Sequence, residues 1–468
     1  MPDKYHIQTR PVTPRRPRIG KFGIVDWRED CCRCHHCVKN ACVYDRYRQE
    51  AEYIRHLRRV DALFFDCMGC FCCVQECTKG LLCMGINPVY EGLGNCYWTP
   101  DIIRTTWAQA ETAKIPVSGA GYRGPFSGPG FDGMWTDMSE IVRPTRDGIH
   151  GREYISTAVD IGRKPGFLGF DQTGLKTSMP PLVMIQMPLI IDLQPAQFSL
   201  PDLRPLTCET ARRTDTLVVA DATDWAVWNE NAGGRLTHVV FHIGDGATLP
   251  EHVLREVRLV EVSDGPDVAE RIAAIKKVNP DLVVCVRVVL DGDGCRRAVE
   301  LAQTDVVDVL HIRADLNGNE IGVERPRFLK EMIREVHTAL IDSGRRDEIT
   351  LIAGGGIALP EHMAKAIICG ADLVSVELPL MVGLECHLCD SCRPGLPCPA
   401  ELEEIDPAYG VGRMTNLIAA WHDQLIEVMG AMGMREVRRL RGDVGRCMFF
   451  EQLEEETFGK LFGRRKNA

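Results

Sequence analysis

The sequence predicts an α/β fold: a TIM-like (β/α)8 barrel preceded by an α+β domain that binds two iron–sulfur clusters. Two observations predict it. Ten of the 21 cysteines fall between Cys31 and Cys77, and eight short apolar runs follow one another between residues 181 and 376. Dense local thiols indicate metal clusters, and apolar runs separated by polar or helical stretches indicate parallel strands with crossover helices.

The composition is that of an ordinary folded protein. The chain has 468 residues, of which 45% are hydrophobic and 26% charged, so its length allows two or three domains. The 55 Lys and Arg against 65 Asp and Glu give 55 − 65 = −10, which argues against a nucleic-acid or anionic-membrane partner. No run approaches the roughly 18 apolar residues of a membrane span, and the N-terminus holds no apolar signal core. We expect a cytoplasmic protein.

Changes in residue composition along the chain predict six segments. Residues 1–25 are polar and basic, and Pro11, Pro14 and Pro17 prevent a helix there. The glycines and prolines that follow a short helix near residues 100–113 indicate irregular structure. The segments are an extended arm at 1–25, a cluster domain at 26–98, a Gly/Pro-rich linker and wrapping segment at 99–179, the barrel at 180–384, a third cluster loop at 385–400 and a C-terminal helical segment at 401–468.

The first two cysteine runs have the spacing of cubane ligands. The second run reads C-x2-C-x2-C-x3-C, and the first repeats the triplet with one extra residue before its last thiol. In such runs three thiolates hold one cluster, while the fourth reaches the neighbouring cluster. The crossed assignment places Cys31, Cys34, Cys37 and Cys77 on one [4Fe-4S] cluster, and Cys67, Cys70, Cys73 and Cys42 on the other. Zinc is the alternative for any thiol group, but paired triplets favour cubanes.

This region resembles a two-cluster bacterial-type ferredoxin, although the usual proline after each fourth cysteine is absent. Residues 45–60 show helical spacing between the two runs, so we expect one helix to join them. Cys32 and Cys72 lie beside ligands and are expected to be spare. The segment 26–98 is therefore predicted to be a ferredoxin-like domain.

The eight apolar runs predict the barrel strands. They are residues 181–191, 216–220, 237–243, 258–262, 282–290, 306–312, 349–353 and 373–376. Eight such runs within about 200 residues favour a closed barrel over its alternative, a doubly wound sheet. The active face of a barrel lies where its strands end. After the barrel, Thr415 or Asn416 is expected to begin a packing helix that ends near Gly433.

A third cysteine run follows the last predicted strand. It contains Cys386, Cys389, Cys392 and Cys398. Either all four hold a [4Fe-4S] cluster, or Cys386, Cys392 and Cys398 hold a [3Fe-4S] cluster. A structural zinc is the remaining alternative. Either iron–sulfur cluster would add a third electron-transfer centre to the chain.

Three consecutive glycines end the seventh predicted strand. Gly354, Gly355 and Gly356 open the helix that follows, and bare backbone N–H groups at such a turn can approach a phosphate. Together with Ala364-Lys365-Ala366, Gly370-Ala371-Asp372, the C-x5-C-x5-C-Pro run and Gly433-Met434-Arg435, this turn resembles the FMN-binding central domain of glutamate synthase. The fused cluster domain and the total length are similar to the archaeal-type large subunit.

The resemblance implies a function and its residues. It implies FMN, with its phosphate on Gly354, Gly355 and Gly356, and with Arg287, where the family usually has lysine, beneath the flavin. We take Arg287 and Asp315 as candidate catalytic residues, and an ion pair of Arg287 with Asp315 or Glu377 as the alternative role. It also implies transfer of glutamine-derived ammonia to 2-oxoglutarate, a small-molecule substrate, and separate redox or amidotransferase subunits in a hetero-oligomeric complex.

Two other functions stay open. The chain has Glu377-Leu378 where the family places Gly-Thr against the flavin phosphate. An electron-transfer subunit whose barrel has lost FMN and serves as a scaffold would explain that difference. An N-methylglutamate synthase-type subunit, which has the same barrel, is the weaker alternative.

Overall fold

A computed structural model describes residues 5–16, 19–25, 34, 41, 43, 70–80, 83–115, 130–136, 154–177, 179–193, 203–389, 398–402 and 405–459. The chain divides into two compact units. The first contains Met1–Val12, Thr105–Cys386 and Cys392–Ala468, and the second contains Thr13–Arg104 and His387–Ser391.

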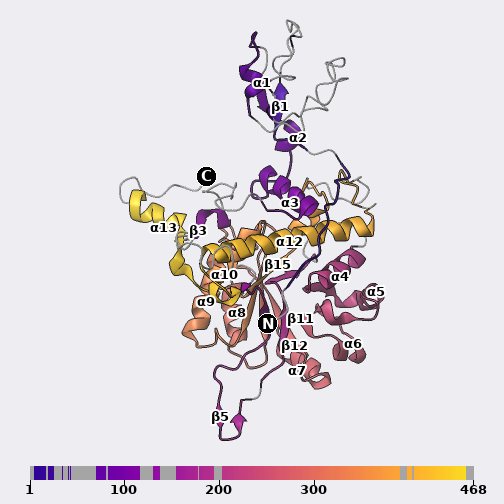
Figure 1. Ribbon diagram of the computed structural model, residues 1–468. Helices are drawn as coiled ribbons and strands as arrows, with labels where there is room; N and C mark the ends of the chain where they lie inside the picture. Colours follow the sequence, from indigo (N-terminus) through magenta and orange to yellow (C-terminus); the bar gives the residue numbers. More distant parts are fainter. Residues whose placement is uncertain are drawn as a thin grey trace. The chain divides into compact units, whose positions relative to one another are not determined.

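The first unit is built on a closed barrel of eight parallel strands, in which each strand pairs with the next one along the chain and the last closes on the first (Figure 1). This confirms the predicted fold class. The strands are β8 (Leu189–Ile191), β9 (Leu217–Asp221), β10 (Val239–Ile243), β11 (Leu259–Ser263), β12 (Val283–Val289), β13 (Val309–Arg313), β14 (Thr350–Gly354) and β15 (Leu373–Val376). Their aliphatic and β-branched side chains are buried on both faces of the strands, either inside the barrel or against the helices outside it.

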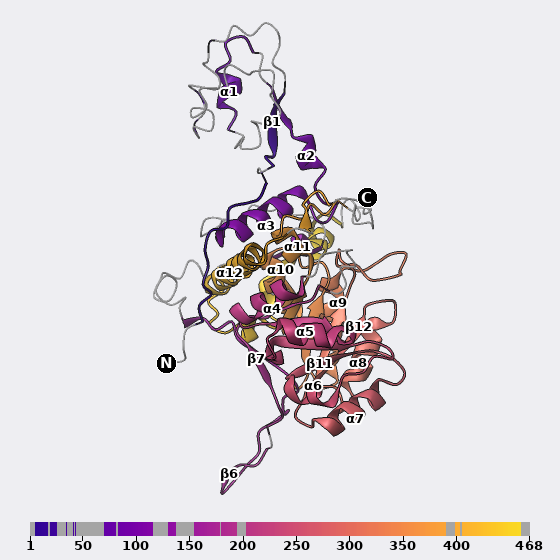
Figure 2. The ribbon, with the colours of Figure 1, turned by 90° about the vertical axis from the view of Figure 1, so that its right-hand side faces the viewer.

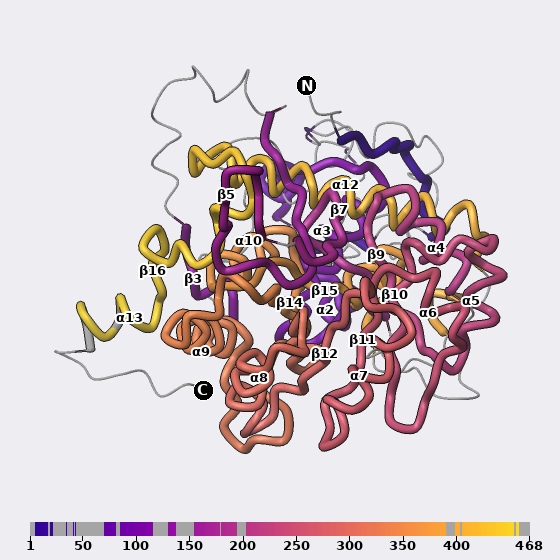
Figure 3. Tube along the Cα trace, turned by 90° about the horizontal axis from the view of Figure 1, so that it is seen from below, coloured from indigo at the N-terminus to yellow at the C-terminus, as the bar shows by residue number. Residues whose placement is uncertain are grey.

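Seven helices follow the strands in turn, and Figure 3 shows them surrounding the strands. They are α4 (Arg204–Arg213), α5 (Trp225–Asn231), α6 (Glu251–Glu256), α7 (Val268–Val278), α8 (Gly294–Ala302), α9 (Leu329–Asp342) and α10 (Pro360–Cys369). After β15 come the short α11 (Leu378–Gly383) and the long α12 (Pro407–Ala431). Because α12 packs against both α10 and α4, it fills the place of the eighth helix.

The first predicted strand is two strands in the structure. β7 (Val183–Ile185) pairs antiparallel with β4 (Val159–Ile161) outside the barrel, and only β8 enters it. Gln186, Met187 and Pro188 separate the two strands, and proline cannot donate to a ladder hydrogen bond. The predicted run 181–191 contains both strands, but the break between them was not predicted.

The predicted start of the C-terminal helix is wrong by about two turns. α12 begins at Pro407, because the Asp406 side chain accepts a hydrogen bond from Tyr409 N at 3.0 Å and proline suits the first helical position. Asn416 lies inside the helix, where its Nδ2 donates to the carbonyls of Arg10 and Ala110. Gly433 has φ 69° just past the helix end, as expected of a terminating glycine.

Short strands from the connecting segment attach to the barrel unit. β3 (Met134–Thr136) pairs with β16 (Cys447–Phe449), and the 3-10 turn Gly130–Gly133 precedes β3. β5 (Phe170–Asp171) and β6 (Gly174–Leu175) form a hairpin that reaches away from the barrel (Figure 2). The end of the chain contains α13 (Phe450–Glu454) and a π turn at Glu455–Gly459.

The second unit contains short elements around the described cysteines. β1 (Phe22–Val25), which falls in the segment expected to be an extended arm, pairs antiparallel with β2 (Cys83–Ile86). Helix α1 (Cys72–Gln75) carries part of the second cysteine run, and α2 (Pro88–Glu91) follows β2. The helix α3 (Pro100–Thr112) matches the short helix expected near residues 100–113 and continues into the first unit. The helix predicted for residues 45–60 lies outside the described residues.

Candidate active site

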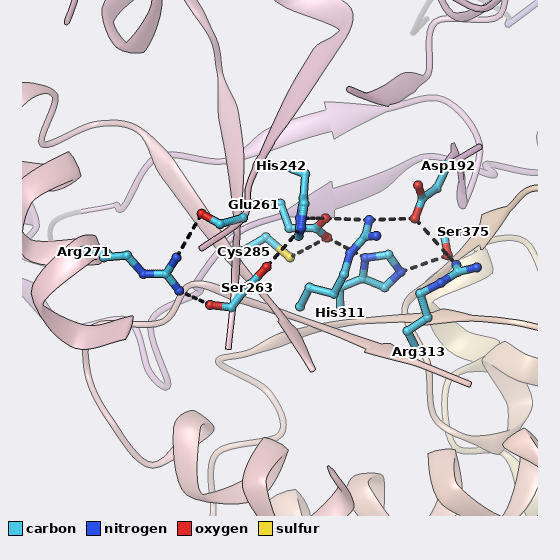
Figure 4. Close-up of polar contacts among 11 residues, drawn as sticks. Asp192, His242, Glu261, Ser263, Arg271, Cys285, His311, Arg313 and Ser375 are labelled. Carbon is cyan, nitrogen blue, oxygen red and sulfur yellow. Dashed lines mark hydrogen bonds and ion pairs between the residues drawn. The ribbon is translucent and has the colours of Figure 1, made fainter. Parts of the chain in front are cut away.

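Charged and polar side chains fill the upper part of the barrel interior, where an ordinary barrel core is apolar. We call this group the interior cluster, and Figure 4 shows its members apart from Glu377. Eight of its members lie on five of the eight strands, and the other two directly follow β8 and β15. They are Asp192, His242, Glu261, Ser263, Cys285, Arg287, His311, Arg313, Ser375 and Glu377.

Glu261 is the centre of the cluster. Its Oε2 lies 2.6 Å from Arg287 Nη2 and 2.9 Å from His242 Nδ1, and its Oε1 lies 2.6 Å from His311 Nδ1. The residue is only 1% exposed. A carboxylate removed from water in this way needs several donors, and three donors from three other strands supply them.

This arrangement sets the tautomers of both histidines. An ionised Glu261 only accepts, so His242 and His311 each carry a hydrogen on Nδ1. Each Nε2 then accepts a hydroxyl hydrogen bond, from Ser263 Oγ at 3.1 Å and from Ser375 Oγ at 2.9 Å. The result is two Ser–His pairs that share one carboxylate.

The electrostatics keep Glu261 ionised and His311 neutral. Burial alone would raise the pKa of Glu261, but Arg287 and the two histidines hold that pKa well below its usual range. Burial lowers the pKa of His311, and the positive charge of Arg287 acts in the same direction, while Glu261 opposes them. Burial and the nearby Glu261 charge raise the pKa of Cys285 well above its usual value, so its thiol stays protonated.

Arg287 also joins Glu261 to the second half of the cluster. Its Nη2 lies 2.7 Å from Asp192 Oδ2, which is 3.6 Å from Arg313 Nη1. Arg313 Nη2 in turn lies 3.3 Å from Glu377 Oε1. Burial would lower the pKa of Arg287, but Glu261 and Asp192 raise it above its usual value. The ion pair of Arg287 expected with Asp315 or Glu377 is therefore formed with Asp192 and Glu261 instead.

Glu377 is the least stabilised carboxyl of the cluster. It directly follows β15, is 1% exposed, and neither of its oxygens accepts a hydrogen bond of good geometry among the described residues. Burial raises its pKa to about 7, because the charge of Arg313 offsets only part of the desolvation. The cluster contains three carboxyls but only two guanidinium groups. Because Glu377 has the weakest positive partner, it is the carboxyl that takes up a proton.

The predicted glycines lie against this cluster. A side chain on Gly354 would overlap Ser375 Oγ and approach Arg313 and His311. Gly355 and Gly356 have φ values of 99° and 66°, and a side chain on either would meet the backbone of the loop after β13, between Ala314 and Gly318. The three glycines therefore allow two loops and the interior cluster to pack together at the strand ends.

Asp315, the second candidate catalytic residue, has a local role in the structure. Its Oδ1 accepts from Asn317 N at 2.9 Å and from Asn319 N at 2.7 Å. Those bonds hold the loop after β13 that packs on Gly355 and Gly356. None of the contacts described for Asp315 joins it to Arg287.

Two buried side chains of α10, the helix after the glycines, make polar contacts with neighbouring segments. His362 Nδ1 accepts from Ala358 N at 3.2 Å, and His362 Nε2 faces Asp132 Oδ1 at 3.4 Å. Lys365 Nζ, also buried, donates to the Phe131 carbonyl at 2.7 Å. These contacts attach the Gly130–Gly133 turn to α10.

Sequence reasoning found Arg287, noted Glu377 and placed His311 near the active face without giving it a role, but it missed Glu261 and His242. A signal was present for Glu261, His242 and His311 alike. Every one of them is a polar residue in the middle of an apolar run, as in Leu-Val-Glu-Val-Ser for Glu261. Because parallel strands of a barrel are buried on both faces, a charged residue inside such a run must find partners in the interior.

The described cysteine ligand candidates lie in several places. In the second unit Cys73 is buried on α1, Cys70 is exposed before it, and Cys77 follows two residues past the helix end. Cys34 and Cys389 also belong to that unit, while Cys386 and Cys398 belong to the first. Cys31, Cys37, Cys42, Cys67 and Cys392 lie outside the described residues.

Comparison with known proteins gives a consistent result. The conserved region in glutamate synthase matches residues 253–435. The archaeal-type glutamate synthase [NADPH] of Dehalococcoides mccartyi is 26% identical over 91% of this chain and 94% of its own length. The archaeal glutamate synthase [NADPH] of Archaeoglobus fulgidus is 22% identical over 91% and 93%.

Two further comparisons are more limited. The Methanocaldococcus jannaschii archaeal glutamate synthase [NADPH] reaches 37% identity, but over only 24% of this chain and 23% of its own. Among solved structures, a flavocytochrome b2 variant with bound pyruvate aligns with a TM-score of 0.45 and 11% identity over 78% of this chain and 89% of that one. That structural likeness is too weak to bear on function. The region matched and the near full-length relatives agree: the chain is similar to glutamate synthases along most of its length.

Proposed function

We propose that this chain is an iron–sulfur oxidoreductase that passes electrons through its cysteine-bound clusters to a reaction site at the barrel mouth. The reaction proposed from the family is the reductive transfer of glutamine-derived ammonia to 2-oxoglutarate. The observation that carries the proposal is the buried group of Arg287, Arg313 and Glu377, which offers two fixed positive charges beside one protonatable carboxyl. An anionic substrate that gains electrons and protons needs both kinds of group.

The cysteines fit iron–sulfur clusters by the chemistry of their donors. Cys73 lies on α1, Cys70 precedes that helix and Cys77 follows it, and thiolate sulfur is the ligand that cubane clusters use. We propose the crossed assignment for the two N-terminal [4Fe-4S] clusters, and a third [4Fe-4S] or [3Fe-4S] cluster on Cys386, Cys389, Cys392 and Cys398. Clusters of this kind exchange single electrons, so three of them on one chain form a relay.

The residues at the barrel mouth fit an anionic flavin. We propose that Gly354, Gly355 and Gly356 hold the phosphate of FMN and that Arg287 faces its ring. Arg287 Nε is buried and makes no hydrogen bond among the described residues, and Arg313 Nη2 makes no hydrogen bond of good geometry although it is ion-paired with Glu377, as expected where an acceptor is to be bound. Glu377 fits beside an anion only in its protonated form, and its pKa of about 7 makes that form accessible. When bound, the flavin would convert single electrons into hydride transfer.

The chain's own residues have defined tasks in this proposal. Glu261 and Asp192 hold the Arg287 guanidinium in place, so its positive charge needs no reorganisation when negative charge develops nearby. Glu377 gives or takes a proton at its carboxyl oxygens. His311, with its hydrogen fixed on Nδ1, holds the Ser375 hydroxyl below Gly354.

A second function has an observation in its favour. In its ionised form, Glu377 at about 4 Å from a phosphate would cost on the order of 4 kcal/mol at an effective dielectric constant of 20. The ion pair between Glu377 and Arg313 also occupies the donor that a phosphate would use. Both points favour an electron-transfer subunit in which the barrel has lost FMN and acts as a scaffold.

One experiment separates the two functions. The protein is purified without oxygen, and its iron, zinc and released flavin are counted per chain. About twelve iron atoms, three clusters of four, with one FMN support the catalytic function. The same iron without flavin supports the electron-transfer function. A colourless protein, or one loaded with zinc, contradicts both.

We further propose that the chain works in the cytoplasm with separate redox or amidotransferase subunits. The relatives that it matches over nearly their full length are glutamate synthases [NADPH], so a pyridine nucleotide is the proposed source of electrons through a partner chain. In the part of the chain that the structure describes, none of the helices has the length and apolar character of a membrane span.

A further inference from the structure

A hairpin with large apolar side chains extends from the barrel unit. The segment of residues 163–179, which we call the arm, leaves β4, forms β5 and β6, and returns toward β7 (Figure 2). Phe167 is 82% exposed and Phe170 is 70% exposed. Leu168, Leu175 and Met179 are also about half exposed or more. Five large apolar side chains on one short protrusion exceed the single scattered residues that a monomer's surface normally shows.

The arm is held in shape by its own hydrogen bonds. Asp171 Oδ1 accepts from Thr173 N at 2.7 Å, and Gly174 takes φ 128° at the turn. Gly169 donates to Thr177 Oγ1 at 2.6 Å and accepts from Lys176 N at 2.8 Å. The apolar side chains are therefore presented on a formed hairpin, which lowers the entropy cost of binding.

The base of the arm is fixed to the end of the barrel where the strands begin. Arg163 Nη2 lies 2.8 Å from Glu348 Oε2, and Arg163 Nη1 donates to the Thr304 carbonyl at 3.0 Å. Thr350 Oγ1, on the first residue of β14, donates to the Gly162 carbonyl at 2.7 Å. This end of the barrel is opposite to the reaction site, so the arm serves a separate purpose.

Exposed apolar residues also lie next to the base of the arm. Val306 precedes β13, Ile341 lies in the last turn of α9, and Met184 is on β7. All three are more than a third exposed. We call them the receiving patch. The arm and the receiving patch thus share one face of the same unit, which is the condition for a two-fold pair in which each copy both gives and receives an arm.

We propose that the arm binds the receiving patch of a second copy of this chain, and that the pair is a two-fold dimer formed by arm exchange. The five arm side chains offer roughly 500 Å² per copy. Two arms and two patches together bury roughly 1,500–2,000 Å², which is the size of a stable protein interface. The dimer is independent of the proposed redox function, because no cluster or substrate residue belongs to it.

The test is the mass of the full chain in solution, measured by light scattering and sedimentation at micromolar concentration. We expect the wild-type mass to be twice that of one chain. The double variant Phe167→Ser/Phe170→Ser should weaken the dimer at least about a hundredfold, because each copy loses two buried aromatic anchors. Both side chains are exposed in the single chain, so the fold should be unaffected. The matched control is Met448→Ser, which changes a similarly exposed residue on β16 and should leave the dimer intact.

A second measurement identifies the contact itself. A photo-crosslinking amino acid is placed at position 170, and isotopically labelled and unlabelled chains are mixed before irradiation. Crosslinks between differently labelled chains, at or beside Val306, Ile341 or Met184, support the proposal. A monomeric wild type, a dimer that survives the double variant, or an arm that instead binds lipid vesicles or a different protein overturns it.

Discussion

At the residue scale, the main feature is the number of charges inside the barrel. Two guanidinium groups face three carboxyls, and Glu261 and Asp192 take the shortest contacts with Arg287. Glu377 has only Arg313, at 3.3 Å. The carboxyl with the weakest partner is therefore the one whose pKa rises, to about 7.

Replacing Glu377 with Gln should flatten the dependence of stability on pH. The folded-state pKa of about 7 lies above the ordinary value of 4.5, so the folded chain binds this proton more tightly than the unfolded chain does. Its contribution is fully present below pH 4.5 and is lost as the pH rises through 7. The loss is between about 3 and 4 kcal/mol, at about 1.4 kcal/mol for each of the roughly 2.5 pKa units between 4.5 and 7. Urea unfolding at pH 5 and pH 8 measures it.

The variant should thus gain stability relative to wild type as the pH rises from 5 to 8. The matched control is Glu320→Gln, because Arg327 hydrogen bonds lower the pKa of Glu320 and it does not titrate in this window. Equal pH slopes for wild type and Glu377→Gln would show that Glu377 stays ionised throughout.

Arg287 illustrates what the sequence can and cannot predict at this scale. Its place on a predicted strand and the family resemblance singled it out as a site residue. The ion-pair partners of Arg287 could not be predicted from the sequence, because Asp192 and Glu261 lie at other strands. The register between strands decides which interior residues meet. The polar residues can be read from the sequence, but the strand register that brings them together cannot.

At the element scale, the eight strands were predictable because each is a continuous apolar run between polar or helical stretches. The errors fell where a local signal was overlooked. Pro188 divides the first run into β7 and β8, and the Asp406-Pro407 pair starts α12. Both are signals of sequence alone, so a closer reading of proline positions would have found them.

Replacing Asp406 with Ala should destabilise the barrel unit by about 1 kcal/mol, because the N-cap bond to Tyr409 N is lost. Thermal unfolding followed by far-UV circular dichroism measures the change. Asp423→Ala is the control, since Asp423 lies in the interior of α12, where alanine is favourable for a helix. If the two variants melted at the same temperature, Asp406 would contribute nothing as a cap.

At the scale of the whole molecule, the chain combines a cysteine-rich unit with a barrel unit. The family matches extend over both. The cluster assignments depend on spacing alone, because five of the twelve proposed ligands lie outside the described residues. A direct test of the crossed assignment is therefore needed.

Cys77→Ala should remove the cluster of the first triplet and leave that of the second. Electron paramagnetic resonance of the reduced protein, combined with iron counting, distinguishes the two. Cys72→Ala is the control, because Cys72 is the expected spare thiol and both clusters should persist. Loss of only the second cluster in Cys77→Ala would reverse the crossed assignment.

The position of α12 has a consequence for biosynthesis. It completes the ring of helices between α10 and α4, yet it is encoded after the third cysteine run. While the ribosome is still translating that run, all eight barrel strands have been synthesised, but the helix that packs between α10 and α4 has not. Closure of the ring of helices by α12 is thus a late event in synthesis, and insertion of the proposed third cluster would come at about the same stage.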